Sequence, residues 1–262
     1  MTLSAEEVAG AADALFDAGR SRRPIAPLTD RHPTIDVSDA YAVQLANVDR
    51  LRKEGQQVAG HKVGLSSRAM QRMLGVDEPD YGHLLDPMFL LDGESVPITR
   101  FIQPRVEIEV AFVLGRALAG PGRTVADVVR ATDCVLPAIE IVDSRVVDWS
   151  IRLPDTIADN ASSGAVVLGG RPRRVTDLDL KVTGGLLRAN GRITETGAAG
   201  AVLGNPMTAV AWLANKVAAF GVTLDPGHVI MSGSFTRMIP VRAGDDVRAE
   251  LEDMGNVAIS FR

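Results

Sequence analysis

The chain has little of several residue types that build common functional sites. Among its 262 residues there is a single cysteine, Cys134, and there are four histidines. Intramolecular disulfides and metal sites made of several thiolates are therefore excluded. There is no basic surplus either, since 28 lysines and arginines stand against 33 aspartates and glutamates, for a net charge of −5. Because no basic residues are left over to neutralise phosphates, the composition argues against a nucleic-acid-binding protein.

Long apolar runs and common cofactor motifs are also missing. The longest uncharged stretch, 196–215, contains three glycines and the dipeptide Asn205-Pro206, so it predicts a loop and a helix start rather than a membrane span. The first residues carry no basic segment ahead of an apolar run, so no signal peptide is expected. GxGxxG, P-loop and nucleophile-elbow motifs are absent. With 46% hydrophobic residues, the chain is expected to be a cytoplasmic globular protein with no membrane partner.

The first 57 residues predict a helical N-terminal segment. Ser4 and Glu7 fit the capping box of a first helix, which Gly19 is expected to end. Apolar residues at helical spacing predict a second helix between Ser38 and Gly55. The proline-rich stretch between the two helices predicts a loop.

The remaining residues, 58–262, predict a β-rich domain. Short β-branched runs are separated by glycines, and Asn190-Gly191 is a hairpin turn signal. Helices are expected only at 67–74, at 125–132 and from Asn205 to Gly221. Because strands and helices do not alternate steadily, the pattern predicts an α+β fold and not a doubly wound sheet.

Two glutamates share one face of a predicted strand. Alternation along 105–114 places Glu107 and Glu109 on the same face, with Cα atoms about 7 Å apart, while the other face is wholly apolar. The simplest interpretation is a strand with one buried and one solvated face. Ala111 and Val113 continue the carboxylate face, however, so that face is not plainly exposed to water.

A third glutamate, Glu140, lies in the segment 135–142, where both faces of the predicted strand are otherwise apolar. Such a strand is normally buried on both faces, and a buried carboxylate is costly unless it is paired or binds a metal. Lys62 or Arg145 could supply the pairing cation. Alternatively, three carboxylates without a histidine or thiolate form the ligand set of a hard cation, Mg²⁺ or Mn²⁺.

Three further segments contain polar residues that could take part in chemistry. Lys62 is isolated among apolar and small residues before Gly64. A buried position would make it useful as an acid, a base or an anion anchor, whereas an exposed one would make it an ordinary surface lysine. The segments 77–83 and 158–164 are rich in ionisable or small polar residues, and each could line a site or form a solvated turn.

The order and spacing of these segments resemble those of a known family. GHKVGLSS, DEPDYGHLLD, PRVEIEVAFVLG, PAIEIVDSR, ADNASSG and AVLGNPMTAVAWLANK together are similar to the 2-keto-4-pentenoate hydratases, which belong with 4-oxalocrotonate decarboxylase to the fumarylacetoacetate hydrolase superfamily. The resemblance extends from Ala40 to the C-terminus. It implies a mixed β-roll or barrel-like sheet with flanking helices, usually assembled as a homo-oligomer, with 58–262 as the catalytic domain.

The resemblance also implies roles for individual residues. A divalent metal, Mg²⁺ or Mn²⁺, would be bound by the glutamates that match the family's E-x-E pair and its later glutamate, which are Glu107, Glu109 and Glu140. The catalytic residues would be Lys62 and Asp80, the second of which belongs to the D-x-P-D-[FY]-G loop. Contacts with the substrate are expected from Ser162 or Ser163 and from His83.

The implied reaction is the addition of water to 2-hydroxypenta-2,4-dienoate or a longer alkyl homologue. Its product is a 4-hydroxy-2-oxo acid, formed in the catabolism of aromatic or steroid ring-cleavage products. The segment 232–237 looks more like that of some decarboxylases and steroid-pathway members, so a 4-oxalocrotonate-type decarboxylase is the alternative enzyme, although Asp80 favours the hydratase. A non-catalytic subunit, associated with a pathway aldolase or decarboxylase, is an alternative of another class.

Overall fold

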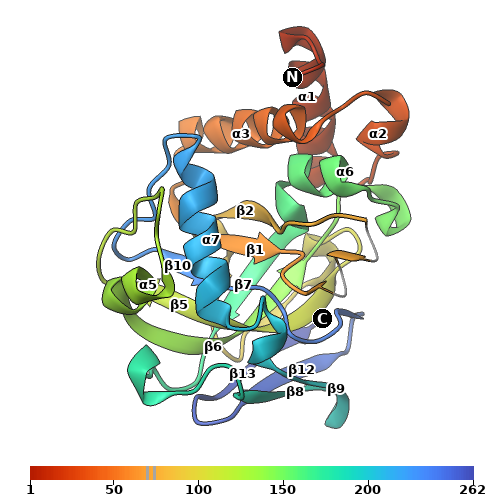
Figure 1. Cartoon of the computed structure of the whole chain (residues 1–262). Helices are drawn as coiled ribbons and strands as arrows, with labels where there is room; N and C mark the ends of the chain where they lie inside the picture. The colour runs from red at the N-terminus through yellow and green to blue at the C-terminus, as the bar shows by residue number, and fades with distance from the viewer. Residues whose placement is uncertain (69–70, 73–74) are drawn as a thin grey trace.

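The computed structural model describes residues 1–68, 71–72 and 75–262. Three helices near the N-terminus lie together at one end of the molecule, drawn in red and orange in Figure 1: α1 Ala5–Ser21, α2 Leu28–Arg31 and α3 Val37–Lys53. The predicted capping box is confirmed, since the Ser4 hydroxyl accepts from the Glu7 N–H and the Glu7 carboxylate accepts from the Ser4 N–H. The two long helices that the sequence predicts are therefore present.

The ends of these helices differ from the predicted ones. α1 continues past its predicted end because Arg22, with φ of 57°, takes the left-handed conformation that terminates the helix. α3 begins earlier than predicted, since Asp36 is its N-cap and forms a capping box with Asp39. α2 lies in the stretch predicted to be a loop, where a tertiary contact anchors it: the N–H and hydroxyl of Thr29 donate to the Asp155 carboxylate.

The larger of two sheets has eight strands, in the order β2-β1-β10-β5-β6-β7-β3, with β11 beside β5. β1 and β10 run parallel, as do β3 and β7, and the other pairs are antiparallel, so the sheet is mixed. Its strands are β1 Val58–Gly64, β2 Asp80–Leu85, β3 Phe89–Leu90, β5 Arg105–Leu114, β6 Thr132–Val142, β7 Ser163–Leu168, β10 Val229–Met231 and β11 Ile239–Pro240.

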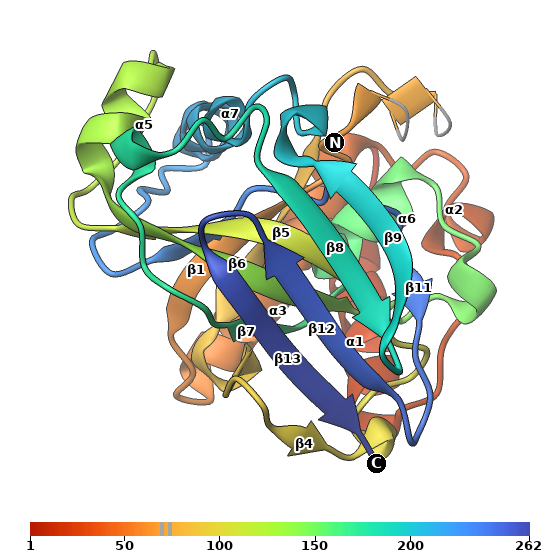
Figure 2. The ribbon, with the colours of Figure 1, turned by 90° about the horizontal axis from the view of Figure 1, so that it is seen from below.

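The smaller sheet has five strands, in the order β4-β13-β12-β8-β9. They are β4 Ser95–Val96, β8 Gly184–Ala189, β9 Arg192–Ala198, β12 Asp246–Leu251 and β13 Gly255–Phe261. The hairpin predicted at Asn190-Gly191 is confirmed: it joins β8 to β9 with φ values of 52° and 76°. Figure 2 shows that this sheet lies across β5, β6 and β7 of the larger one.

The sheets are flanked by the helices α5 Val125–Ala131, α6 Leu153–Ala158 and α7 Pro206–Ala218. α7 starts as predicted, with Pro206 in its first turn and the Asn205 side chain accepting from the Met207 N–H at 3.0 Å. The helix predicted at 67–74 lies partly outside the described residues.

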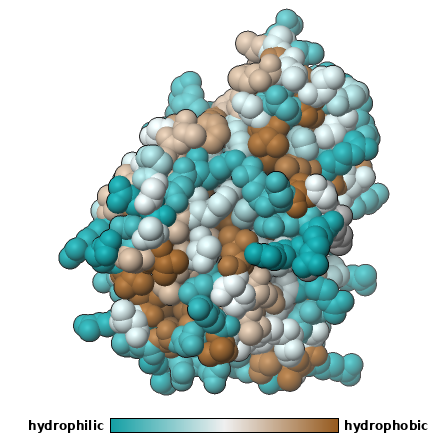
Figure 3. Space-filling model, in the orientation of Figure 1, coloured by the Kyte–Doolittle hydropathy of each residue, from teal (hydrophilic) through white to brown (hydrophobic). Residues whose placement is uncertain are grey.

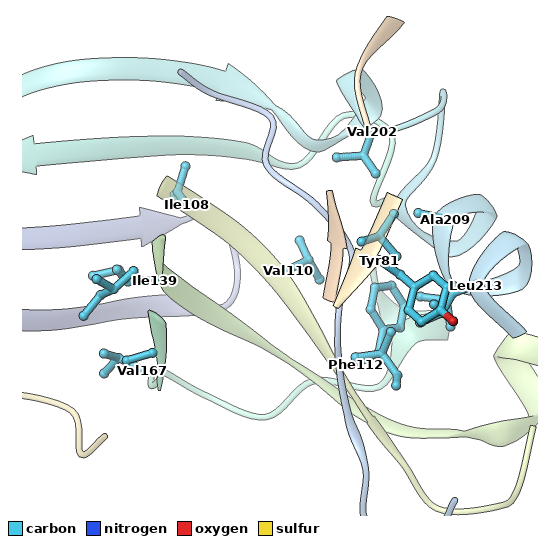
Figure 4. Close-up of a cluster of buried hydrophobic side chains, with 14 of the residues drawn as sticks. Tyr81, Ile108, Val110, Phe112, Ile139, Val167, Val202, Ala209 and Leu213 are labelled. Carbon is cyan, nitrogen blue, oxygen red and sulfur yellow. The ribbon is translucent and has the colours of Figure 1, made fainter. Parts of the chain in front are cut away.

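The main hydrophobic core lies between the larger sheet, the smaller sheet and α7 (Figure 4). Alternate residues of β5 point into it, and Ile108, Val110 and Phe112 are fully buried. Phe112 lies beside Leu213 of α7, while Ile108 lies toward the smaller sheet. The opposite face of β5 therefore carries the residues in between, among them the two predicted carboxylates.

The predicted α+β class, with a curled mixed sheet and flanking helices, is confirmed. On the molecular face drawn in Figure 3, hydrophobic residues form separate patches between hydrophilic ones. Within the described ranges, no helix combines the length and the apolar character needed to cross a bilayer.

Candidate active site

Three carboxylates converge on the face of the larger sheet that is turned away from the main core. β5 and β6 are antiparallel neighbours, and their register places Glu107 directly opposite Glu140, with Glu109 opposite Ala138. One carboxylate oxygen from each of the three glutamates lies within 4.8 Å of the others. Strand alternation places Glu107 and Glu109 on one face of β5, and the pairing of β5 with β6 adds Glu140.

Burial makes this cluster electrostatically unfavourable on its own. Glu109 and Glu140 are 0% and 1% exposed, and Glu107 is partly buried. Burial and the neighbouring Glu140 raise the pKa of Glu107 to about 8, and the same causes raise the pKa of Glu109 well above its usual range. A compensating positive charge would therefore favour the ionised form of the cluster.

The donor set fits a hard divalent cation. Glu109 Oε1 and both carboxylate oxygens of Glu140 are buried and accept no hydrogen bond from the described residues. The other oxygen of Glu109 accepts from the Gly233 N–H at 2.7 Å, which orients that carboxylate. Buried polar atoms without partners point to an unseen ion or water, and an all-oxygen set is the one that Mg²⁺ and Mn²⁺ prefer.

Lys62 of β1 lies beside the carboxylates and is 4% exposed. Its Nζ is 3.4 Å from Glu140 Oε1 and donates to the Ala161 carbonyl at 2.8 Å. Burial alone would lower the pKa of Lys62, but the charges of Glu140 and Asp80 outweigh burial and raise it. Of the two candidate partners for Glu140, the structure selects Lys62, because Arg145 is paired with Asp159 instead.

Asp80 is the first residue of β2 and lies directly opposite Gly64 of β1. The carboxylate is 1% exposed; Oδ2 accepts from the Thr156 hydroxyl at 3.2 Å, and Oδ1 has no hydrogen-bond partner among the described residues. Burial raises its pKa despite the nearby Lys62. The side chains of Lys62 and Asp80 thus lie close together, with the space between them kept open by Gly64.

We expect Gly64→Ala to damage the site more than the fold. A Cβ at this position would lie 2.1 Å from Asp80 Oδ1 and 3.4 Å from Lys62 Nζ, so Asp80 must shift. Turnover should fall roughly 10–100-fold through misplacement of these groups, while unfolding free energy should fall by about 1–3 kcal/mol. The control is Gly10→Ala in α1, where a Cβ meets nothing within 4 Å, and which should stabilise by up to about 1 kcal/mol. Wild-type turnover in Gly64→Ala would contradict this account of the site.

The structure separates the two candidate serines. The Ser162 hydroxyl donates to Asp159 Oδ2 at 2.9 Å and is thereby engaged. Ser163 is 4% exposed, and its Oγ has no hydrogen-bond partner among the described residues. A Cβ on Gly82, the residue paired with Lys62, would lie 3.0 Å from that Oγ. Ser163 is therefore the serine whose hydroxyl is free to meet a ligand near Lys62.

His83 is not brought to the carboxylates. It follows Asp80 at an odd spacing in β2, so its side chain lies on the other face of the strand. There it contacts the His61 ring, with centroids 4.8 Å apart, and its Nδ1 lies 3.0 Å from Gln44 Oε1. To make its predicted contact with the substrate, the His83 side chain would have to pass to the other face of the strand.

The burial of His83 predicts a loss of stability in acid. Burial, aided by Arg52 and His228, lowers its pKa from 6.5 to about 4. Between these values the unfolded chain binds a proton that the folded chain does not, so stability is complete at pH 7 and falls as the pH decreases through this window. The measurement is the free energy of unfolding in urea at pH 7 and at pH 4. Its decrease between these pH values should be smaller in His83→Gln than in the wild-type protein by about 2–3 kcal/mol. Equal declines in both proteins would contradict the prediction.

Several residues that shape the site carry little sequence signal. Gly233 supplies the N–H for Glu109, Thr156 the hydroxyl for Asp80, and Ala161 the carbonyl for Lys62. Each acts through the backbone or through a partner distant in sequence. Gly233 and Ala161 lie in the segments 232–237 and 158–164, which the sequence brings forward, but nothing in those segments indicates what their backbone groups bind.

Comparison with known proteins shows what the chain as a whole is similar to. The family profile described as fumarylacetoacetate (FAA) hydrolase C-terminal matches residues 59–262. The chain is 45% identical over 256 residues to 2-oxo-hept-4-ene-1,7-dioate hydratase of Escherichia coli, which covers 95% of this chain and 96% of that protein. It is also 45% identical over 251 residues to 2-keto-4-pentenoate hydratase of Paraburkholderia xenovorans, covering 96% and 93%.

Solved structures show the same architecture. 4-Oxalocrotonate decarboxylase from Pseudomonas putida G7, complexed with magnesium and adipate, matches with a TM-score of 0.97 and 35% identity, over 100% of this chain and 99% of that one. Fumarylpyruvate hydrolase from Pseudomonas aeruginosa, in complex with Mn²⁺ and pyruvate, is 12% identical with a TM-score of 0.62 over 77% of this chain and 88% of that one, and shares the fold alone.

Proposed function

Because the chain belongs to the fumarylacetoacetate hydrolase family, with relatives at 45% identity that are hydratases, we propose that it is a divalent-cation-dependent hydro-lyase acting on 2-hydroxy-2,4-dienoates. The observation that supports this most is the convergence of three carboxylates beside the buried Lys62; two of them, Glu109 and Glu140, are buried and have oxygens without partners among the described residues. A purely structural role has no use for so many uncompensated buried charges.

The three glutamates would hold the cation. When bound, Mg²⁺ or Mn²⁺ would supply Lewis-acid chemistry and a template for the carboxylate and 2-oxygen of the substrate. Glu109 is oriented for this role by the Gly233 N–H, and Glu140 by its place opposite Glu107. The Ser163 hydroxyl, free and close to Gly82, is suited to donate to the substrate carboxylate.

Lys62 and Asp80 would move protons and orient water. Addition of a proton at C5 of the dienol, with loss of the 2-hydroxyl proton, gives a conjugated 2-oxo-3-enoate. Water then adds at C4, and a proton is delivered to C3, so the product differs from the substrate by one water. Lys62, held charged by the carboxylates, can donate a proton, while Asp80, with a free Oδ1, can accept one from water.

A decarboxylase is the second candidate, and it is supported by the 4-oxalocrotonate decarboxylase structure. That reaction uses the same stabilised dienolate but needs a substrate with a second carboxylate. The hydratase is favoured because the hydratase relatives are more similar in sequence, at 45% against 35% identity.

Substrate choice is decided by a paired assay with Mg²⁺. Supplied with 2-hydroxypenta-2,4-dienoate, the purified protein should bleach the dienol absorbance and form 4-hydroxy-2-oxopentanoate. Supplied with 4-oxalocrotonate, it should release little CO₂. The reverse pattern would establish the decarboxylase. If the protein converts neither compound, and no longer alkyl or dicarboxylate dienol, the non-catalytic subunit is the remaining function. The homo-oligomer and the association with an aldolase or decarboxylase remain predictions that light scattering would test.

A further inference from the structure

A backbone segment next to the site has an unusual conformation. Asn160, Ala161 and Ser162 have φ values of 55°, 50° and 51°, so three consecutive residues other than glycine lie in the left-handed region. L-residues rarely adopt it, and then singly, because the Cβ approaches the carbonyl oxygen. Such strain persists only where surrounding contacts impose it, and it concentrates at functional sites.

Arg145 and Asp159 impose the conformation. The Arg145 guanidinium donates to the carbonyls of Asp143, Ser163 and Asp159 at 2.7, 2.8 and 2.5 Å, and forms an ion pair with the Asp159 carboxylate. Asp159 Oδ2 in turn accepts from the Ser162 hydroxyl at 2.9 Å and from the Arg145 N–H at 3.0 Å. The arginine therefore binds the chain on both sides of the left-handed turn, at 159 and at 163.

Asn160 fastens the turn to the sheet. Its side-chain oxygen accepts from the His83 N–H at 2.7 Å, and its side-chain nitrogen donates to the His83 carbonyl at 2.9 Å. β2 thus holds one end of the turn next to β1, on which Lys62 lies.

This arrangement directs one buried carbonyl oxygen, that of Ala161, at Lys62. The Ala161 carbonyl, at the middle of the turn, accepts from Lys62 Nζ at 2.8 Å, which is shorter than the 3.4 Å between Lys62 Nζ and Glu140 Oε1. We infer that Arg145 is a positioning residue: through Asp159 it holds the 160–162 turn, and through the Ala161 carbonyl it fixes the ammonium of Lys62. The inference rests on the proposed role of Lys62 in proton transfer.

Arg145→Lys tests this inference because it keeps the charge beside the buried Asp159 but cannot reproduce the fork of bonds to three carbonyls. We expect kcat to fall roughly 10–100-fold because Lys62 is misplaced. The dissociation constant for Mn²⁺ should stay within about threefold of wild type, because Arg145 is paired with Asp159 and not with the three glutamates. KM should rise as well, since Arg145 also holds the Ser163 carbonyl. Arg188→Lys in β8, which disturbs an ion pair with Glu250 far from Lys62 in the fold, is the matched control and should keep wild-type kcat.

A double-mutant cycle separates positioning from a general structural role. In a Lys62→Met background, Arg145→Lys should change the residual kcat by less than about threefold, because its effect is transmitted through the lysine. Equal losses in both backgrounds, or wild-type kcat in folded Arg145→Lys, would overturn the inference. Should Arg145→Lys not fold, Asp159→Asn takes its place, with the same two expectations.

A crystal structure of the variant keeps this test distinct from that of the proposed function. If the wild-type protein turns over no dienol, the proposed function fails, but the distance from Lys62 Nζ to the Ala161 carbonyl still decides the positioning. Its loss in Arg145→Lys, with the carboxylate cluster in place, supports the inference; an unchanged turn and contact would overturn it.

Discussion

Exhaustive chelation with EDTA should abolish dienol turnover, and Mg²⁺ or Mn²⁺ should restore it. Without a cation, Glu107, Glu109 and Glu140 are like charges crowded in a buried place, as the raised pKa values of the first two show. Zn²⁺ should be a poor substitute, since the cluster offers no nitrogen or sulfur ligand. Because the cation competes with protons, its affinity should decrease as the pH falls below about 8, the pKa of Glu107.

The isosteric change Glu140→Gln isolates the role of one ligand. We expect the dissociation constant for Mn²⁺ to rise roughly 10–100-fold or more, with little change in the fold. Glu250→Gln in β12 is the matched control, because it removes a strand carboxylate that is paired with Arg188 and lies outside the cluster. If Glu140 served only in an ion pair with Lys62, Glu140→Gln would cost stability and leave the Mn²⁺ affinity unchanged. Full activity in chelated protein would contradict the metal assignment altogether.

Replacement of Lys62 by methionine should lower kcat by roughly 10²–10⁴-fold, the usual size of a general acid–base contribution. The ammonium is buried, charged and held by Glu140 and the Ala161 carbonyl at the edge of the carboxylate cluster, so no nearby group replaces it. Metal binding should persist, because Lys62 is not a ligand. The measurement is steady-state kinetics at saturating Mg²⁺, accompanied by Mn²⁺ titration.

The control for Lys62 is Lys216→Met in α7, a lysine paired with Glu78 and only partly buried. Its kcat should stay within a factor of two or three of wild type, as expected for a peripheral ion pair. A Lys62→Met enzyme with comparable activity would remove Lys62 from the mechanism and leave Asp80 as the remaining proton-transfer candidate.

The fold was predictable where the chain is locally consistent. β-Branched alternation identified β5 and β6, and Asn190-Gly191 identified the hairpin between β8 and β9, because both signals act over neighbouring residues. Helix ends were less predictable, since a left-handed Arg22 or an Asp36 cap competes with other plausible residues. The tertiary contact that holds α2 has no local signature.

The members of the site were more predictable than their arrangement. Glu107 and Glu109 follow from alternation, but the register that sets Glu140 opposite Glu107 depends on the pairing of two strands. The segment 77–83, which includes Asp80, was predicted to line a site or form a solvated turn, whereas β2 starts at Asp80. Because successive side chains of a strand point to opposite faces, His83 and Asp80 then lie on opposite faces of β2.

The role of Arg145 shows why the remainder could not be predicted. Two cations, Lys62 and Arg145, were equally plausible partners for Glu140, and only the folded chain gives each its own carboxylate. The left-handed turn at 160–162 contains no glycine, and although Asn160 is of a type that tolerates this conformation, Ala161 and Ser162 are not. Its conformation is dictated by contacts from elsewhere in the chain.

Diffraction from crystals grown with Mn²⁺, recorded at the manganese absorption edge, would locate the cation itself. We predict one strong anomalous peak on the face of the larger sheet opposite the main core, with oxygens of Glu107, Glu109 and Glu140 at about 2.1 Å. Water or a substrate analogue should complete its coordination on the side of Lys62 and Asp80. No peak at this cluster at saturating Mn²⁺, with Glu140 bound only to Lys62, would contradict the assignment of these glutamates as the metal ligands.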